Sequence, residues 1–207
     1  MDKPKLVVVL TLALAAAAGR AEAQVADVSL GIGGVAMDAS YETWSTSLHS
    51  PALDARANVR LSDRFSIEPY ITYGRRTIAV REYSQFAIGG DTQRTEGLYG
   101  VVLHQRLSNL THSGFHAYLS YGLSGAYYKE AVPERLYVYG PRTVTTTPAY
   151  TRTQTDPMIY PSVGLGVRKS LGDHIAIRAD ADAIAFFIFP AGVRASVGLV
   201  VPFGANQ

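Results

Sequence analysis

The chain has 207 residues, a formal net charge of +2 and no cysteine. A charge balance this close to neutral provides no basic field, so nucleic acid is excluded as a partner. The lack of cysteine excludes disulfide bonds and a lipid anchor attached to a cysteine, so the stability of the fold must come from other interactions.

Residues 1–23 have the features of a secretory signal peptide. Two lysines give a positive start, residues 6–18 form an apolar run, and residues 21–23 match an A-x-A cleavage site. A run of about 13 residues is too short to cross a bilayer as a helix, which takes ~20 apolar residues. We therefore predict an exported protein with one mature domain at residues 24–207, rather than a chain with a buried N-terminal helix.

The mature chain shows apolar and polar residues alternating with period two, which is typical of β-strands. We predict eight strands, at residues 27–37, 52–61, 64–74, 95–107, 114–128, 157–170, 174–186 and 191–203. Each has about the 9–11 residues that a tilted strand needs to cross a bilayer. The predicted fold is all-β: an eight-stranded antiparallel up-and-down transmembrane barrel.

The connections between the predicted strands alternate in length. Short turns are expected at residues 62–63, 108–113 and 171–173, and longer loops at residues 38–51, 75–94 and 129–156, with a short connection at 187–190. This layout is typical of outer-membrane barrels, whose short turns face the periplasm and whose long loops face outward.

Two of the long connections contain their own strand-type residues. Gly89-Gly90-Asp91 and Gly140-Pro141 are predicted turns between arms rich in Tyr, Val and Thr, which favour strands. We predict two hairpins that project into the medium, with disordered loops as the alternative.

Alternation alone does not say which face points into the barrel, because a soluble lipocalin-like barrel would be apolar inside. The polar row is rich in glycine and serine, which suit the crowded lumen of an eight-stranded barrel that side chains just fill. The apolar row is flanked by aromatic residues, as in the girdles at the two lipid–water interfaces. These aromatics are Phe65, Phe115 and Phe203 at one end and Tyr73, Tyr83, Tyr127, Tyr160 and Phe187 at the other.

The polar row also carries nearly equal numbers of positive and negative side chains. An unpaired buried charge costs about 3–5 kcal/mol, so such a balance is what a packed lumen requires. The mature chain uses arginine for nearly all its cations, and arginine binds a carboxylate through two hydrogen bonds. We predict a structural lumen charge network of Asp54, Arg56, Arg60, Glu68, Glu96, Arg106, Arg168, Arg178, Asp180, Asp182 and Arg194.

Asp180 and Asp182 are separated by one residue, a pattern that also occurs in metal sites. Alternate residues of a strand lie ~6.6 Å apart on one face, which permits a bridging cation, but no further ligand cluster lies nearby in the sequence. We therefore favour ion pairs with Arg56, Arg168 or Arg194, with Arg194 as the expected hairpin neighbour, and predict no metal and no cofactor.

A catalytic Ser–His pair is the alternative for the polar row. His116 and Ser120 share a face, but four residues along one strand are ~13 Å, too far for the hydrogen bond that activates a serine. Two prolines also lie within predicted strands, where each removes a ladder hydrogen bond. We expect Pro161 near the outer rim and Pro69 at a bulge or beside an unpaired carbonyl.

The last strand ends with a recognisable pattern: a polar residue, Gly, a hydrophobic residue and an aromatic at Ser196, Gly198, Val201 and Phe203. This pattern resembles the C-terminal assembly signal of bacterial outer-membrane barrels, although four residues follow the aromatic here. With the signal peptide and the eight segments, the mature chain resembles the small OmpA/OmpX-type barrels of Gram-negative bacteria, including the porin-opacity type. The resemblance implies an outer-membrane location and insertion by the barrel-assembly machinery, and it transfers no activity.

The expected role is structural or surface interaction at the cell surface, meaning adhesion or partner binding without catalysis. The expected partners are the outer-membrane lipids and an extracellular partner bound near residues 75–94 and 129–156. A lipid-modifying outer-membrane enzyme is the first alternative, and a soluble lipocalin-like ligand-binding barrel is the second.

Overall fold

The structure is a computed structural model that describes residues 26–41, 44–80, 87–107, 114–139, 143–155, 158–172, 174–186 and 189–203. Its strands are β1 (Ala26–Tyr41), β2 (Trp44–Arg60), β3 (Phe65–Ile78), β4 (Ala87–Gly89), β5 (Thr92–Arg106), β6 (Phe115–Val132), β7 (Arg135–Tyr139), β8 (Thr143–Thr147), β9 (Tyr150–Thr155), β10 (Tyr160–Ser170), β11 (Ala176–Phe186) and β12 (Phe189–Phe203). No helix in these ranges is long and apolar enough to cross a membrane. The predicted signal peptide, Tyr83 and Phe187 lie outside the described residues.

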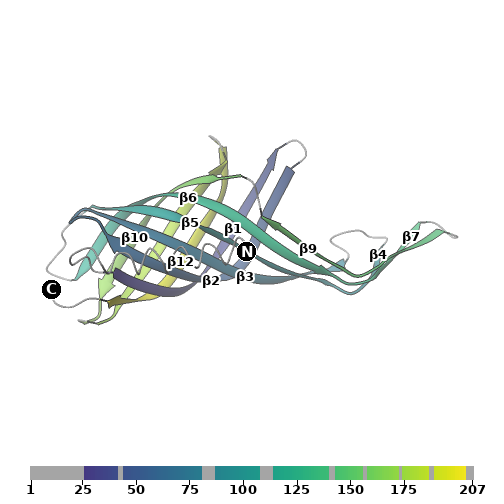
Figure 1. Ribbon diagram of the computed structural model, residues 1–207, viewed down its shortest axis with the longest axis horizontal. Helices are drawn as coiled ribbons and strands as arrows, with labels where there is room; N and C mark the ends of the chain where they lie inside the picture. Colours follow the sequence, from purple (N-terminus) through teal and green to yellow (C-terminus); the bar gives the residue numbers. More distant parts are fainter. Residues whose placement is uncertain are drawn as a thin grey trace.

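Eight of the strands close into an antiparallel barrel, as predicted (Figure 1). The order around it is β1-β2-β3-β5-β6-β10-β11-β12, and β12 pairs with β1 to complete the ring. The short connections after β2, β5 and β10 mark one end, which we call the turn end. The opposite end, from which a sheet projects, is the arm end.

The strand registers stagger regularly around the ring. Following paired residues once around the barrel from Ala26 returns to Ala36, ten residues further along β1. The path runs through Val59, Ile67, Leu103, Tyr121, Val163, Ala183 and Val193. A stagger of this kind requires the strands to tilt by about 35–45° from the barrel axis.

The two strand prolines are accommodated in different ways. At Pro69 the β2–β3 ladder has the same register on both sides but lacks two pairs, so the proline leaves a local gap rather than a bulge. Pro69 still lies opposite Val101 of β5. Pro161 lies beyond the last β10–β11 pair, Ser162 with Ile184, and is therefore near the arm-end rim as predicted.

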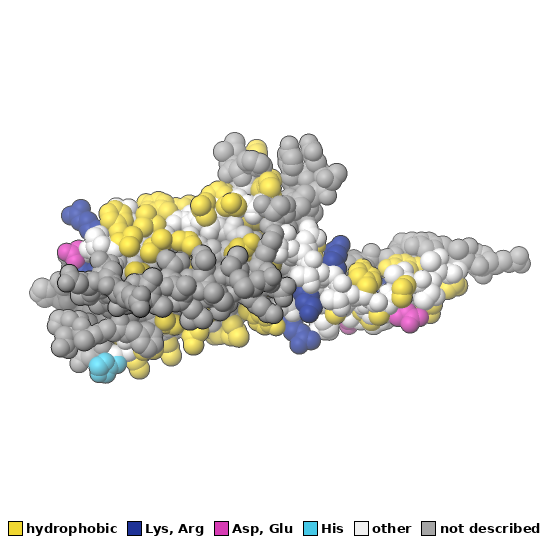
Figure 2. All heavy atoms as spheres, in the orientation of Figure 1, with side chains coloured by type: hydrophobic (Ala, Val, Ile, Leu, Met, Phe, Trp, Pro, Cys, Tyr) yellow, Lys and Arg dark blue, Asp and Glu magenta, His cyan; other side chains and the backbone are white. Residues whose placement is uncertain are grey.

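The outward face of the barrel is apolar along its strands. Leu30 and Ile32 are 66% and 70% exposed, and hydrophobic side chains cover much of the visible barrel surface in Figure 2. The other exposed apolar residues of this belt include Val28, Leu53, Val101, Leu103, Tyr121, Leu123, Val163, Leu165, Ile177, Val193, Val197, Leu199 and Val201. A soluble barrel would bury them, whereas lipid covers such a belt. The prediction that the apolar row faces outward is confirmed, and the lipocalin-like alternative is wrong.

The arm-end half of the lumen is filled with apolar side chains, which we call the apolar plug. Its members are Val35, Met37, Leu48, Tyr70, Leu98, Val102, Ala126, Tyr160, Ile184, Phe186 and Ala191. The prediction that placed Tyr160 in the outer aromatic girdle is wrong, because Tyr160 is completely buried and packs against Phe186. It lies opposite Ser124, whose side chain is buried in the lumen, so alternation turns Tyr160 inward as well.

β3, β5 and β6 continue beyond the barrel and form an arm (Figure 1). β9 extends this sheet by pairing with the outer part of β6, and β4, β7 and β8 form a separate three-stranded sheet. The predicted hairpin around residues 140–141 is confirmed, since β7 pairs with β8. The other predicted hairpin is wrong: β4 pairs with β7, because the outer part of β5 is already bonded on both sides, to β3 and β6.

A second projection is formed by β1 and β2. The sequence predicts a long loop at residues 38–51, but most of these residues belong to this hairpin, which continues to the pair Tyr41–Trp44. The β2–β3 ladder ends at Ala52 and Gly74, so the hairpin and the arm separate beyond that point.

Candidate functional site

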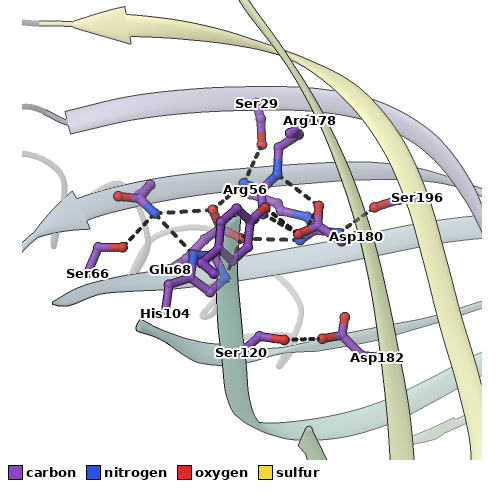
Figure 3. Close-up of polar contacts among 12 residues, drawn as sticks. Ser29, Arg56, Ser66, Glu68, His104, Ser120, Arg178, Asp180, Asp182 and Ser196 are labelled. Atoms are coloured by element: carbon purple, nitrogen blue, oxygen red, sulfur yellow. Dashed lines mark hydrogen bonds and ion pairs between the residues drawn. The ribbon is translucent and has the colours of Figure 1, made fainter. Parts of the chain in front are cut away.

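The turn-end half of the lumen holds a cluster of buried charges that we call the lumen network. Its members come from β2, β3, β11 and β12: Asp54, Arg56, Glu68, Arg178, Asp180, Asp182 and Arg194. None is more than 7% exposed. Figure 3 shows most of these side chains reaching into one space from different strands, because alternation turns each of them inward.

Glu68 is at the centre of the lumen network (Figure 3). It is completely buried and accepts hydrogen bonds from both terminal nitrogens of Arg178, with Nη2 3.0 Å from Oε1. Arg56 Nη1 lies 3.3 Å from the same oxygen, and Arg56 also donates to Asp54 and, over 2.5 Å, to Ser196. One carboxylate therefore connects guanidinium groups from β2 and β11, two strands that do not pair with each other.

Asp180 and Asp182 are each bound by an arginine. Arg178 donates to Asp180 from Nε and Nη2, at 2.8 and 2.9 Å, and the Tyr118 hydroxyl donates over 2.6 Å. Arg194 donates to Asp182 from Nε and Nη2, at 3.0 and 2.5 Å. The described residues include no group of three or more acids or histidines placed to hold a metal ion. Both aspartates are therefore ion-paired: Asp180 with Arg178 of its own strand and Arg56 across the lumen, and Asp182 with Arg194 of the neighbouring strand.

Aromatic rings also pack in the lumen, and one of them contacts an arginine of the lumen network. The Arg194 guanidinium lies 3.8 Å from the ring centre of Tyr70, whose hydroxyl is 2.5 Å from Ser124 Oγ. Tyr118 lies over Gly166, where an added Cβ would clash with the ring. The small residues of the polar row thus provide the space that the rings occupy.

The fold can be compared with solved structures, whereas no known family model and no curated protein matches the chain. A major outer membrane protein from Thermus thermophilus gives a TM-score of 0.56 at 10% identity, covering 88% of this chain and 100% of that one. The N-terminal barrel domain of Pseudomonas aeruginosa OprF gives 0.52 at 10%, covering 87% and 97%. Ail, the attachment invasion locus protein of Yersinia pestis, gives 0.50 at 10%, covering 87% and 99%.

The chain has the fold of the small bacterial outer-membrane barrels. In such barrels the apolar belt contacts the lipid of the outer membrane, the short turns face the periplasm and the long segments face outward. The turn end is therefore the periplasmic end, and the arm is extracellular.

Four of the eleven predicted lumen charges lie outside the lumen network of this outer-membrane barrel. Their partners are Asp63 for Arg60, His116 for Arg106, Asp27 for Arg168, and Arg94 with Arg76 for Glu96. Arg60 is exposed at the periplasmic turn, and Glu96 lies at the arm end of the lumen. Asp27 is also buried but is not among the predicted lumen charges, although the inward row through Gly31 and Gly33 contains it.

The serine and histidine considered for catalysis are engaged separately. Ser120 donates its hydroxyl proton to Asp182 over 2.6 Å, and His116 Nδ1 lies 2.5 Å from a terminal nitrogen of Arg106. Ser120 and His116 therefore do not form the Ser–His pair considered from the sequence.

The predicted assembly signal lies in the last strand of the barrel. Ser196 and Gly198 pair with Gly33 and Gly31 of β1, and Val201 and Phe203 pair with Val28 and Ala26. These residues therefore form the seam at which the barrel closes. Their recognition by the assembly machinery stays a prediction.

The inner face of the arm carries a row of charges across four strands. Arg76, Arg94, Glu130 and Arg152 are consecutive cross-strand neighbours. Arg152 Nη2 lies 3.0 Å from Glu130, and the ring centre of Tyr128 lies 4.3 and 5.5 Å from the guanidinium carbons of Arg94 and Arg152. Burial lowers the pKa of Arg152, but Tyr128 and Glu130 outweigh it and raise that pKa above its ordinary value.

The sheet of β4, β7 and β8 exposes apolar side chains outside the membrane belt. Ile88, Leu136 and Val144 are 60%, 41% and 61% exposed. Ile88 lies opposite Leu136, and Val144 lies opposite Val138, so alternation places these four residues on one face. We call this surface the apolar tip face.

Proposed function

We propose that this protein is a surface-interaction protein that binds a macromolecular partner through its arm. The observation that carries the proposal is the apolar tip face, because apolar side chains grouped on an aqueous surface mark interaction sites. It contains Ile88, Leu136, Val138 and Val144. The fold supports the same class of role, since Ail, described as an attachment invasion locus protein, shares it.

The arm also offers main-chain groups to a partner. Among the described residues, β8 is an edge of the β4-β7-β8 sheet, and β9 pairs with β6 only. An exposed edge strand can accept an extended segment of another protein through main-chain hydrogen bonds. The proposed partner is therefore a protein that covers the apolar tip face and adds a strand to one of these edges.

The filled lumen supports an interaction role over transport or catalysis. The lumen network and the apolar plug occupy successive layers of the barrel interior. Ser120 and His116, the residues considered for a lipid-modifying enzyme, have other partners. We propose that the protein has no catalytic activity, that the assembly machinery inserts it, and that its barrel serves as an anchor for the arm.

The test compares attachment of cells that produce different variants. Ile88→Asp with Leu136→Asp places two charges on the apolar tip face, and Thr77→Asp with Ala131→Asp places two charges on exposed positions of β3 and β6, outside that face and outside β8 and β9. Attachment to surfaces coated with protein should fall for the first variant and persist for the second.

Heat-modifiable migration on a gel checks that both variants still form barrels. Equal attachment by wild type and the tip-face variant would exclude the proposal. If deletion of the protein then made cells sensitive to detergent, a structural role in envelope integrity would replace it.

A further inference from the structure

Where the barrel meets the arm, the side chains of the lipid-facing surface change from apolar to aromatic and then to cationic. Tyr73, Tyr99 and Tyr127 end the apolar belt on β3, β5 and β6, and the rings of Tyr99 and Tyr127 are 6.4 Å apart. One residue pair further outward on the same face lie Arg75 and Lys129. Figure 2 shows cationic side chains gathered where the hydrophobic surface gives way to the arm.

Arg75 and Lys129 belong to one cross-strand row. Arg75 lies opposite Thr95, Thr95 opposite Lys129, and Lys129 opposite Thr153. We call these four residues the outer cation row. Neighbouring strands are about 4.8 Å apart, so the two cations lie roughly 10 Å from each other, with a hydroxyl between and one beside them.

The outer cation row has no carboxylate of its own. The acids at this height, Glu96 and Glu130, point to the inner face, where they bind Arg94 and Arg152. The Arg75 guanidinium contacts the neutral amide of Gln93 at 3.5 Å. The arm therefore gives each of Arg76, Arg94 and Arg152 on its inner face a carboxylate partner and leaves the cations of its lipid-facing side for another anion.

A hollow in the apolar belt lies directly beside Arg75. Ile32, Leu53, Tyr73 and Val197, which form one row across β3, β2, β1 and β12, line it together with Arg75, and its volume is about 700 Å³. The hollow lies below the point where β2 and β3 separate. Its walls are apolar and its outer rim is cationic.

We propose that the outer cation row and this hollow form a binding site for a phosphorylated glycolipid of the outer leaflet, lipid A. A lipid phosphate pairs with Arg75 or Lys129, and the threonine hydroxyls donate to its oxygens. An acyl chain lies in the hollow against Ile32 and Leu53. The order of the rows, apolar then aromatic then cationic, matches the order of acyl chain, interface and phosphate in the lipid.

The site requires an outer-membrane location but not the partner proposed for the arm. Arg75 and Lys129 lie on the opposite face of the arm sheet from the charge row of Arg76, Arg94 and Arg152. Loss of attachment by tip-face variants and loss of lipid binding by cation-row variants are therefore separate outcomes.

The test measures lipid A binding by the full mature protein in detergent micelles, by native mass spectrometry. Arg75→Gln with Lys129→Gln removes both cations, and Arg152→Gln is the matched control because it removes a cation at similar height on the inner face. Each cation near an anionic lipid surface contributes about fivefold in affinity, so the double variant should bind roughly 25-fold more weakly. The control should bind as wild type does.

Two further ligands test the chemistry. Dephosphorylated lipid A should bind wild type and the double variant equally, because it has no phosphate for the outer cation row. Phosphatidylglycerol should bind wild type more weakly than lipid A, since one phosphate cannot engage both cations. Unchanged lipid A binding by the double variant, or equal affinity of wild type for phosphatidylglycerol and lipid A, would overturn the assignment.

Discussion

The two halves of the lumen are enclosed by the same eight strands but filled with opposite chemistry. In the periplasmic half, three arginines meet four carboxylates in the lumen network, whereas in the outer half the apolar plug fills the space with hydrocarbon and aromatic rings. Buried charges must be desolvated and are stabilised only in a defined geometry, but apolar contacts tolerate small shifts. We infer that the lumen network fixes the strand register and that the apolar plug provides burial and a seal.

The largest effect is expected when the centre of the lumen network loses its charge. Glu68→Gln leaves Arg56 and Arg178 without their shared carboxylate inside the barrel. Removing one partner of a buried ion pair costs about 3–5 kcal/mol, and the free energy of unfolding should fall by that amount. Urea titration followed by heat-modifiable migration measures it, and a loss below about 1 kcal/mol would contradict the assigned role of Glu68.

A cavity in the apolar plug should lower the free energy of unfolding somewhat less than Glu68→Gln does. Leu98 is completely buried in the plug, and Leu98→Ala removes its packing without exposing a charge. Comparable core truncations cost about 2–5 kcal/mol, depending on how far the neighbours relax. The same urea titration should show this loss. A result like that of a surface substitution would mean that the plug is loosely packed and does not seal the lumen.

Replacing one ion pair of the lumen network by apolar side chains, like those of the apolar plug, tests how the charges contribute to stability. Arg194→Met alone leaves Asp182 without its arginine and should be strongly destabilising. Arg194→Met with Asp182→Leu replaces the pair by apolar groups, and the unfolding free energy should return to within about 1 kcal/mol of wild type. A double-mutant cycle measures the coupling. Purely additive losses would show that the two side chains do not act as a pair.

The smallest effect on stability is expected at the periplasmic rim of the barrel, where an ion pair lies outside both the lumen network and the apolar plug. Arg60 binds Asp63 at the periplasmic turn, and both side chains are largely exposed. Exposed pairs contribute about 0–1 kcal/mol, so Arg60→Gln should hardly move the urea midpoint. A loss as large as that of Glu68→Gln would place Arg60 in the lumen network after all.

The sequence predicts well which face of each strand points into the barrel, because the alternation of apolar and polar residues is a local property. Period two identified the barrel strands, the inward side of Asp180 and Asp182, and Arg194 as the hairpin neighbour of Asp182. The height of a residue along the barrel is not local, because it depends on the ten-residue stagger and on which strands pair. For this reason the sequence predicts one network for Arg60 and Glu96, although they lie at opposite ends of the barrel.

Contacts between strands distant in the chain also escaped sequence analysis. Glu68 and Arg178 are 110 residues apart and meet across the lumen rather than along a hairpin. The pairing of β4 with β7 joins two long connections that the sequence presents as independent. Tyr160 is a different case: it lies next to the outward residue Ile159, so alternation already predicts that it faces inward, and only its residue type favours a girdle position.

The continuity of three strands has a mechanical consequence. β3, β5 and β6 each run without interruption from the periplasmic turns into the arm, and β6 spans Phe115–Val132. Antiparallel hydrogen bonds lie perpendicular to the strands, so a pull on the arm along their length loads many of these bonds together in shear. Tension on the arm is thereby distributed over the barrel wall, and the barrel should resist such a force.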